Sequence, residues 1–405
     1  MASIKVENLT KIFGSAQAID KAKKLVEKGE SKEEIVNQTG ATVGVYDASF
    51  EVNDGEIFVI MGLSGSGKST LLRMLNRLIE PTHGQVSIDG ESVTQANDEE
   101  LRNIRRKKVS MVFQSFALFP HKTILENTEF GLEIQGVDGE ERRKRAQDAL
   151  ETMGLSAYQD QLPEQLSGGM QQRVGLARAL ASDTDILLMD EAFSALDPLI
   201  RANMQDELIE LQSKLNKTIV FITHDLDEAL RLGDRIVLMR NGHIEQIGTG
   251  EEILENPAND YVETFVGGVD RSKVFTAENA MEAPGYVFNK DRVGARVALK
   301  IMQNEHTSTL YVIDGDRKIH GYVTDKDLAD LIRQNKHTKN IHVDEIIRTD
   351  NPLVNRNTPI NEMYDLMSDT NMPIAVVDDD ERLLGYVDRR LVIDQLSGQG
   401  GDNNE

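Results

Sequence analysis

Short, continuous apolar runs recur through the first two thirds of the chain, separated by segments with helical periodicity. The runs are IFVIM (57–61), VSMVFQ (109–114), ILLMD (186–190), TIVFIT (218–223) and RIVLMR (235–240). Buried strands of this kind, alternating with helices, are typical of a parallel sheet that is covered on both faces. The pattern predicts an α/β fold for roughly the first 270 residues.

The first forty residues follow two other patterns. Residues 2–14 alternate apolar and polar positions and predict an edge strand that closes on an aromatic residue, Phe13. Residues 16–38 are rich in Lys and Glu, with apolar residues at helical spacing, and Ser31 and Glu34 form a capping-box pattern. We therefore expect a two-helix insertion near 16–40.

After about residue 270 the chain repeats itself. LYVIDGDRKIHGYV (310–323) aligns without a gap with IAVVDDDERLLGYV (374–387), 64 positions later. Two copies are fewer than a solenoid needs, and each is long enough for a small α/β unit. The polar, glycine-rich end is expected to be a flexible tail. The predicted boundaries are 1–270, 280–340, 341–397 and, for the tail, 398–405.

Composition narrows the class of protein. The chain of 405 residues carries 68 Asp and Glu against 45 Lys and Arg, a net charge of −23, which argues against general nucleic-acid binding. It has no cysteine, so disulfides, thiolate metal sites and cysteine nucleophiles are excluded. No apolar run is long enough to span a membrane, and the N-terminus lacks the apolar block of a signal peptide. We expect a cytoplasmic protein that reaches a membrane only through a partner.

A glycine-rich loop between an expected strand and an expected helix fits the Walker A pattern. Its residues are Gly62, Leu63, Ser64, Gly65, Ser66, Gly67, Lys68 and Ser69, followed by Thr70. Glycines let backbone N–H groups cradle phosphate oxygens, and the helix N-terminus adds positive potential. Lys68 would then bind the β- and γ-phosphates of ATP, and Ser69 would bind Mg²⁺.

Two adjacent carboxylates end the apolar run at 186–190. Asp190 is placed to hold Mg²⁺, and Glu191 to polarise the attacking water. The alternative for Glu191 is an exposed loop acid without a catalytic role.

Residues 166–173, LSGGMQQR, resemble the signature motif of ATP-binding cassette (ABC) ATPases. Other positions match the same family: Gln114 the Q-loop, which also approaches the metal, Ser194 to Asp197 the D-loop, His224 the switch histidine, and Phe13 the adenine-stacking aromatic. The resemblance implies that Ser167, Gly168 and Gly169 of one chain act on ATP held by a second chain, so the cassettes close as a head-to-tail homodimer. A lone histidine is more often structural, but His224 ends an apolar strand as in the family.

A cassette with this insertion and a tandem repeat is similar to the ATPase subunit of glycine betaine/proline-type ABC importers. The resemblance implies ATP hydrolysis coupled to osmoregulatory uptake, at the cytoplasmic face of the membrane. It also implies integral membrane permease subunits and a solute-binding protein or domain as partners. An importer of another solute, a soluble ABC ATPase acting on DNA or ribosomes, and a nucleotide sensor with an idle cassette are the alternatives.

The repeated segments resemble cystathionine-β-synthase (CBS) domains. In the first copy GYVTDKD (321–327) matches the family pattern, which implies that Thr324 and Asp327 meet ribose and phosphate of an adenine nucleotide such as cyclic di-AMP. The second copy has Asp388 and Leu391 at these positions, although Arg389 and Arg390 remain able to bind anions. The pair is expected to gate activity in response to a nucleotide or to ionic strength, or else only to dimerise.

Two further segments carry open interpretations. Residues 115–126 include Phe116, Leu118 and Phe119, which either receive a short helix of a membrane subunit or pack inside the helical part of the cassette. The basic run at 102–108 is either a solvated face or a contact to an anionic surface.

Overall fold

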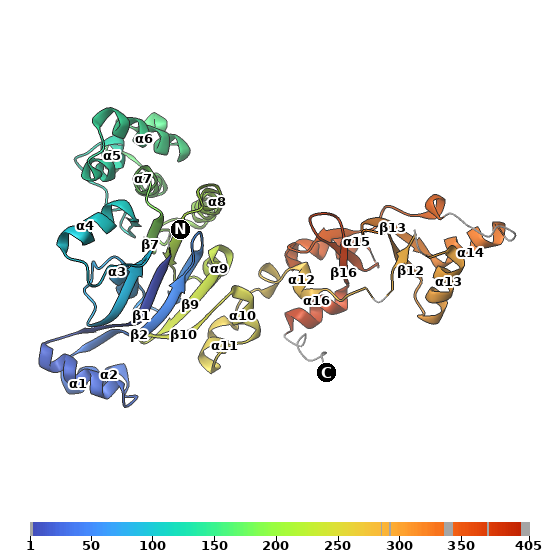
Figure 1. Cartoon of the computed structure of the whole chain (residues 1–405), viewed down its shortest axis with the longest axis horizontal. Helices are drawn as coiled ribbons and strands as arrows, with labels where there is room; N and C mark the ends of the chain where they lie inside the picture. The colour runs from blue at the N-terminus through green and yellow to red at the C-terminus, as the bar shows by residue number, and fades with distance from the viewer. Residues whose placement is uncertain (1–2, 285, 291–292, 336–342, 371, 398–405) are drawn as a thin grey trace. The chain divides into compact units, whose positions relative to one another are not determined.

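The structure is a computed structural model, and it describes residues 3–284, 286–290, 293–335, 343–370 and 372–397. The chain divides into two compact units, residues 1–269 and 270–405 (Figure 1). The expected tail at 398–405 lies outside the described residues, so that expectation stays a prediction. Among the described helices, none combines the length and the apolar character needed to cross a bilayer.

Six strands form the central sheet of the first unit, in the order β10-β9-β3-β8-β7-β6. Their bounds are β3 Ile57–Gly62, β6 Val109–Val112, β7 Ile186–Asp190, β8 Thr218–Ile222, β9 Arg235–Arg240 and β10 His243–Gly248. The first five are parallel and β10 is antiparallel to β9, so the parallel sheet predicted from the apolar runs is confirmed. Since parallel strands end at one edge, the loops after β3, β7 and β8 meet there.

A second, antiparallel sheet covers one face of the first. Its order is β2-β1-β4-β5, with β1 Ile4–Phe13, β2 Thr42–Val52, β4 His83–Ile88 and β5 Glu91–Ser92. The prediction of an edge strand at 2–14 is wrong, because β1 pairs with β2 on one side and β4 on the other. Alternation reports which face of a strand is buried, but it does not report the strand's neighbours.

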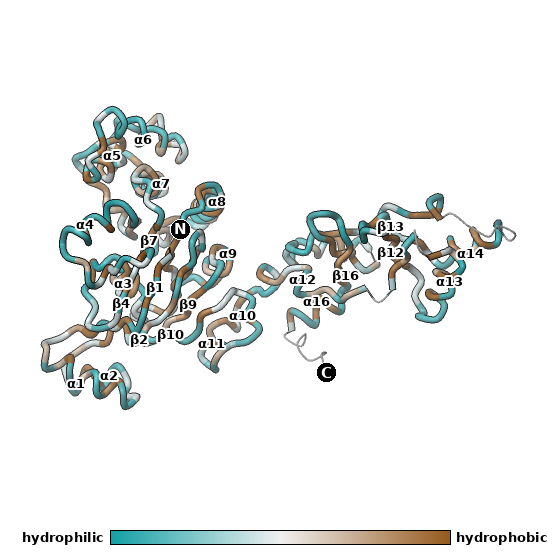
Figure 2. The backbone as a smooth tube through the Cα atoms, in the orientation of Figure 1, coloured by the Kyte–Doolittle hydropathy of each residue, from teal (hydrophilic) through white to brown (hydrophobic). Residues whose placement is uncertain are grey.

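One core fills the space between the two sheets. It joins buried side chains of β1, β2 and β4 to those of β3, β7, β8 and β9, and includes helix α3 (Lys68–Leu75), which follows the phosphate loop. Figure 2 shows hydrophobic colour along these strands, while much of helix α4 (Asp98–Lys107) is hydrophilic. The phosphate loop thus lies between a rigid strand and a helix anchored in the core.

The two-helix insertion is confirmed as α1 (Ala16–Val26) and α2 (Lys32–Thr39). Ser31 and Glu34 form the expected capping box, and Gly40 ends α2 in the left-handed conformation at φ +70°. The insertion has a small core of its own against the ends of β1 and β2. Its buried members are Ile12, Ala22, Ile35, Ala41 and Val43.

The remaining helices of the first unit lie outside the sheets. They are α5 Ile124–Gln135, α6 Gly139–Thr152, α7 Gly168–Ala181, α8 Pro198–Leu215, α9 Leu226–Leu232, α10 Gly250–Glu255 and α11 Asp260–Val266, with short 3₁₀ helices at Ser156–Tyr158 and Pro163–Gln165. Helices α5, α6 and α7 pack against one another as a helical subdomain (Figure 1).

The second unit contains the two repeats, each with a three-stranded sheet. The first copy has β11 Phe288–Asn289, α13 Ala295–Asn304, β12 Thr309–Ile313, β13 Ile319–Thr324 and α14 Asp325–Gln334. The second has β14 Leu353–Asn355, α15 Tyr364–Asp369, β15 Ile374–Val377, β16 Leu383–Val387 and α16 Arg389–Leu396. Short helical turns lie at Arg271–Lys273, Ala277–Ala280 (α12), Asp344–Ile346 and Ile360–Met363.

Equivalent residues of the two copies make the same hydrogen bonds in their hairpin turns. Asp314 and Asp378, 64 positions apart, each accept two backbone N–H bonds within their own hairpin turn. The turns also pair with each other, since the N–H of Leu383 donates to the carbonyl of Arg317 at 3.0 Å. The copies therefore form one packed pair.

Each copy also borrows a segment from outside its own repeat. Backbone N–H groups of Ala277 and Glu278 donate to Thr358 and Arg356, and Glu282 pairs with Tyr386. In the other direction, the backbone of Arg348 pairs with Tyr322 of the first copy. The segment that follows the cassette unit is therefore built into the second copy.

Candidate nucleotide site

The phosphate loop is held in a conformation that requires glycine. Gly65 and Gly67 have φ of +78° and +109°, and a Cβ on Gly67 would lie 2.2 Å from the carbonyl oxygen of Gly44. The loop opens onto a cavity of about 680 Å³. Its lining residues are Phe13, Lys32, Thr42, Gly44, Leu63, Ser64, Gly65, Gly67, Lys68, Ser69, Thr70, Glu191 and His224.

Lys68 is 5% exposed, and its ammonium donates to the carbonyls of Gly62 at 2.8 Å and Leu63 at 3.2 Å. Burial lowers the pKa of Lys68, while the nearby carboxylates of Glu191 and Asp190 act in the opposite direction. The hydroxyl of Ser66 is buried and lacks a hydrogen-bond partner within the described residues. A buried cation and an unpaired hydroxyl beside a cradle of backbone N–H groups fit a nucleotide polyphosphate.

Two of the three residues expected to bind the metal, Ser69 and Asp190, are in contact, whereas the third, Gln114, contacts Glu191. The Ser69 hydroxyl donates to Asp190 Oδ1 at 2.9 Å, and Asp190, 3% exposed, also accepts from Arg73 Nε and Nη2 at 3.1 and 2.9 Å. Hydroxyl and carboxylate oxygens are hard ligands of the kind that Mg²⁺ uses together with phosphate oxygens and water. The bound ion would neutralise charge on the β- and γ-phosphates.

Of the three other residues predicted to act in hydrolysis, Glu191 and His224 line the same cavity as Ser69, and Gln114 is bonded to Glu191. Gln114 Nε2 donates to Glu191 Oε2 at 3.1 Å and to the Ser194 hydroxyl at 3.3 Å. Glu191 directly follows β7 in a left-handed conformation, at φ +48°. His224, one residue beyond Thr223 at the end of β8, lines the same cavity as Glu191. A carboxylate, an amide and an imidazole are therefore available to orient water beside a γ-phosphate.

Phe13 reaches the cavity although the insertion follows it directly. The side chain is 41% exposed, and Lys11 Nζ lies 5.1 Å from its ring centroid. A Cβ on Gly44 would lie 2.8 Å from Phe13 Cε2, so this glycine makes room for the ring. An aromatic face is thus left open for a base to stack on.

The signature residues belong to a different surface. Ser167 is the N-cap of α7 and accepts from the N–H of Met170 at 3.4 Å, and Asp197 caps α8. Among the described residues that line the nucleotide cavity, Ser167, Gly168, Gly169 and Asp197 are absent. One chain therefore does not place its signature on its own nucleotide site, as a site completed by a second chain requires.

Sequence reasoning missed Lys32, Thr42 and Gly44 in the cavity wall and Arg73 on Asp190. Arg73 lies one helical turn after Ser69, so its spacing offered a signal. Lys32 offered none, because only the tertiary fold brings the insertion to the phosphate loop.

The first CBS copy has its expected ligand residues engaged with the protein. Thr324 caps α14 by accepting from the N–H of Asp327 at 3.1 Å. Asp327 in turn accepts from Arg348 Nε and Nη2 at 2.8 and 3.1 Å, and this pairing holds the pKa of Asp327 below its usual value. A nucleotide in this copy would compete with Arg348 for Asp327.

The second copy has a small cavity of about 220 Å³ that includes Asp388, Arg389 and Arg390. Asp388 takes the capping role of Thr324, since it accepts from the N–H of Leu391 at 2.9 Å. Arg389 Nε donates to the carbonyl of Met367 at 3.1 Å. The substitution of Thr by Asp thus keeps the local fold while it changes the charge of the cavity.

The fold and the site are those of an ATP-binding cassette, with a phosphate loop, a buried carboxylate bonded to Ser69, and a separate helix α7 that begins in the LSGGMQQR motif. Residues 45–194 match the ABC transporter family, and residues 294–334 and 343–398 match the CBS domain. The dimeric ATP-binding cassette MJ0796, in a post-hydrolysis state with ADP and Pi, is 35% identical with a TM-score of 0.52. That match covers 61% of this chain and 98% of MJ0796.

Curated relatives match nearly the whole chain. The glycine betaine transport ATP-binding protein OpuAA of Bacillus subtilis is 56% identical over 99% of this chain and 93% of its own length. The glycine betaine/carnitine transport ATP-binding protein GbuA of Listeria monocytogenes is 55% identical over 98% of both chains. The glycine betaine/proline betaine protein ProV of Escherichia coli is 50% identical over 99% of both. The chain belongs to the ABC transporter family, among the ATP-binding subunits of glycine betaine transport.

Proposed function

We propose that this chain hydrolyses ATP to drive the import of glycine betaine or a related compatible solute in response to osmotic stress. One observation carries the proposal: Lys68, Ser69 and Glu191 line one cavity, with Asp190 bonded to Ser69, in a chain 56% identical to OpuAA. The test is betaine uptake at high osmolarity in cells that lack their own importer ATPase but express this chain and its membrane subunits. Lys68→Ala should abolish the uptake, and uptake that persists in that variant would contradict the proposal.

The chain works as a homodimer at the cytoplasmic face of the membrane, bound to permease subunits that act with a solute-binding protein or domain. A groove of about 560 Å³ beside the Q-loop segment supports this arrangement. Phe119 lies in its wall, edge-on to Phe130 at 4.5 Å between ring centroids. Asn127 fixes the backbone of Phe119 through bonds of 2.8 and 3.1 Å. A short helix of the permease, here called the docking helix, would place apolar residues in such a groove.

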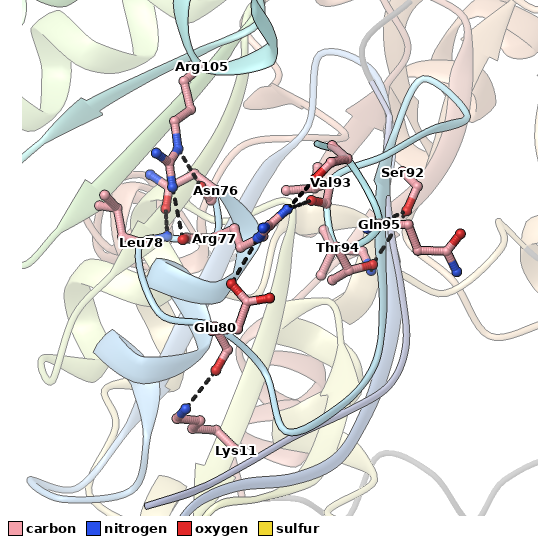
Figure 3. Close-up of polar contacts among 12 residues, drawn as sticks. Lys11, Asn76, Arg77, Leu78, Glu80, Ser92, Val93, Thr94, Gln95 and Arg105 are labelled. Atoms are coloured by element: carbon pink, nitrogen blue, oxygen red, sulfur yellow. Dashed lines mark hydrogen bonds and ion pairs between the residues drawn. The ribbon is translucent and has the colours of Figure 1, made fainter. Parts of the chain in front are cut away.

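The basic run at 102–108 contributes to the same groove. Arg105 is partly committed to the protein, since its Nε and Nη2 donate to the carbonyls of Asn76 and Arg77 at 2.9 and 2.8 Å (Figure 3). Arg102 and Arg106 line the groove as well. The docking helix therefore carries acidic as well as apolar residues, because unmatched cations at a buried contact are costly.

Substitution Phe119→Asp tests the docking. The variant should retain nucleotide binding and ATPase activity but lose solute transport, because the charge disrupts the groove and not the phosphate loop. Leu78→Asp is the matched control, since Leu78 is an exposed apolar residue outside the groove lining. A parallel loss of ATPase activity and transport through unfolding would instead support a purely structural role for Phe119.

The CBS pair gates transport. Exposed ion pairs between Glu278 and Arg356, and between Glu282 and Arg390, fasten the segment after the cassette unit to the second copy. Such pairs weaken as salt rises, because the Debye length falls from about 8 Å at 0.15 M to about 3 Å at 1 M. Cyclic di-AMP between CBS units is the second candidate input.

Transport in proteoliposomes over a series of internal salt concentrations, with and without cyclic di-AMP, tests the gating. Deletion of 280–405 should leave ATP-driven transport working but blunt its response to salt or to the nucleotide. An unchanged salt threshold and nucleotide response after deletion would reduce the CBS pair to a dimerisation module.

A further inference from the structure

A lysine of the α1–α2 insertion, Lys32, lines the nucleotide cavity. Lys32 Nζ donates to the carbonyl of Gly65 at 3.1 Å, and the Lys32 side chain lines the cavity beside Phe13. Gly65 is in the middle of the phosphate loop, so the ammonium lies next to the backbone cradle.

The position of Lys32 is fixed by the local fold. It is the first residue of α2, directly after the N-cap Ser31, whose hydroxyl accepts from the N–H of Glu34 at 3.2 Å. Ile35, one turn later, is 2% exposed in the core of the insertion. The backbone of Lys32 is therefore held, and only its side chain is free to move.

The location of Lys32 is unfavourable for a lysine. A cation in the first turn of a helix opposes the helix dipole, and burial lowers the pKa of Lys32. Among the ion pairs of the described residues, none includes Lys32. An anion in the cavity would offset all three costs.

We propose that Lys32 is a nucleotide-binding residue that contacts the polyphosphate of ATP from the insertion side of the cavity. Lys68 and Lys32 both donate to carbonyls of the same loop. When a nucleotide binds, each ammonium exchanges a neutral carbonyl for a charged phosphate oxygen, which is the stronger acceptor. This inference rests on the ATP site proposed above, and it gives the insertion a direct part in nucleotide affinity.

Equilibrium binding to the full chain tests the assignment. ATP, ADP and adenosine each displace a fluorescent ATP analogue in EDTA, so that hydrolysis does not interfere. Lys32→Gln should weaken ATP and ADP binding about tenfold, equivalent to about 1.4 kcal/mol, and leave adenosine binding unchanged. Lys32→Arg should retain most of the affinity. The matched control is Lys28→Gln, which removes the same charge from an exposed position of the insertion and should bind like the wild type.

Three results would overturn the proposal. They are unchanged ATP affinity in Lys32→Gln, an equal loss for adenosine, and an equal loss in Lys28→Gln. Thermal unfolding without nucleotide tests for a purely structural role. If Lys32 only braces the loop, Lys32→Gln should lower the melting temperature of the free protein. Lys68→Ala separates this inference from the proposed function: if that variant binds ATP normally, the nucleotide site itself is wrong.

Discussion

Replacement of Glu191 by Gln removes the charge of one carboxylate and keeps its shape. In the wild type, Gln114 Nε2 donates to Glu191 Oε2 at 3.1 Å, and a glutamine at 191 can turn its own oxygen to accept the same bond. Lys68 donates hydrogen bonds to carbonyls of the phosphate loop, and Ser69 donates one to Asp190. None of these bonds involves residue 191. We therefore expect ATP binding to survive.

The expected loss lies in the chemical step. A positioned general base contributes roughly 10²–10⁴ to a rate, and at the lower end of that range a 10²–10³ loss corresponds to about 2.7–4 kcal/mol of barrier. Steady-state phosphate release should therefore be about 10²–10³ times slower in Glu191→Gln than in the wild type. Gel filtration with ATP should show the variant as a dimer, because nucleotide trapped between two chains is no longer hydrolysed.

Two results would refute this reasoning. Turnover within about threefold of the wild type would show that Glu191 is the exposed loop acid of the alternative interpretation. Loss of ATP binding in the variant would show that the carboxylate holds the nucleotide or the metal rather than water.

Two more predictions concern the cavity wall and a buried acid. Gly67→Ala should reduce ATP affinity in equilibrium binding by at least about tenfold, because the new Cβ would lie 2.2 Å from the Gly44 carbonyl oxygen. Gly90→Ala is the control and should bind ATP normally, because Gly90 also has positive φ but has open space around it. Burial raises the pKa of Glu228, whose carboxylate accepts from Gln205 at 2.8 Å, so its stabilising contribution is present below the unfolded-state pKa and is lost as pH rises through the higher folded-state pKa. The melting temperature of Glu228→Gln relative to that of the wild type should therefore increase as pH rises above the usual carboxyl pKa of 4.5, and a difference that stays constant as pH rises would contradict the assignment.

The phosphate loop and its neighbours could be predicted because each depends on a short stretch of chain. Glycines in a strand–turn–helix context define the loop around Lys68, and an apolar run that ends in two carboxylates places Asp190 and Glu191 at the same sheet edge. The contiguous repeat likewise predicted two similar small units, which the matching turns at Asp314 and Asp378 confirm.

Features that depend on the approach of distant segments could not be predicted. Alternation in residues 2–14 correctly indicated a half-buried strand but not the second neighbour, β4, that makes it internal. The spacing of the insertion predicted both helices, yet nothing local shows that Lys32 meets Gly65, 33 positions later. The pairing of Asp327 with Arg348 likewise could not be predicted, because only the tertiary fold brings together these residues, 21 positions apart.

ATP-dependent uptake of labelled glycine betaine tests the central claim most directly. The chain is reconstituted with its membrane subunits in proteoliposomes, with Mg-ATP enclosed on the side of the ATPase and betaine outside. The account predicts that betaine accumulates against its concentration gradient. This accumulation should increase with internal salt, require ATP and disappear in Glu191→Gln. Betaine uptake that proceeds equally without ATP, or at the same rate in Glu191→Gln, would contradict it.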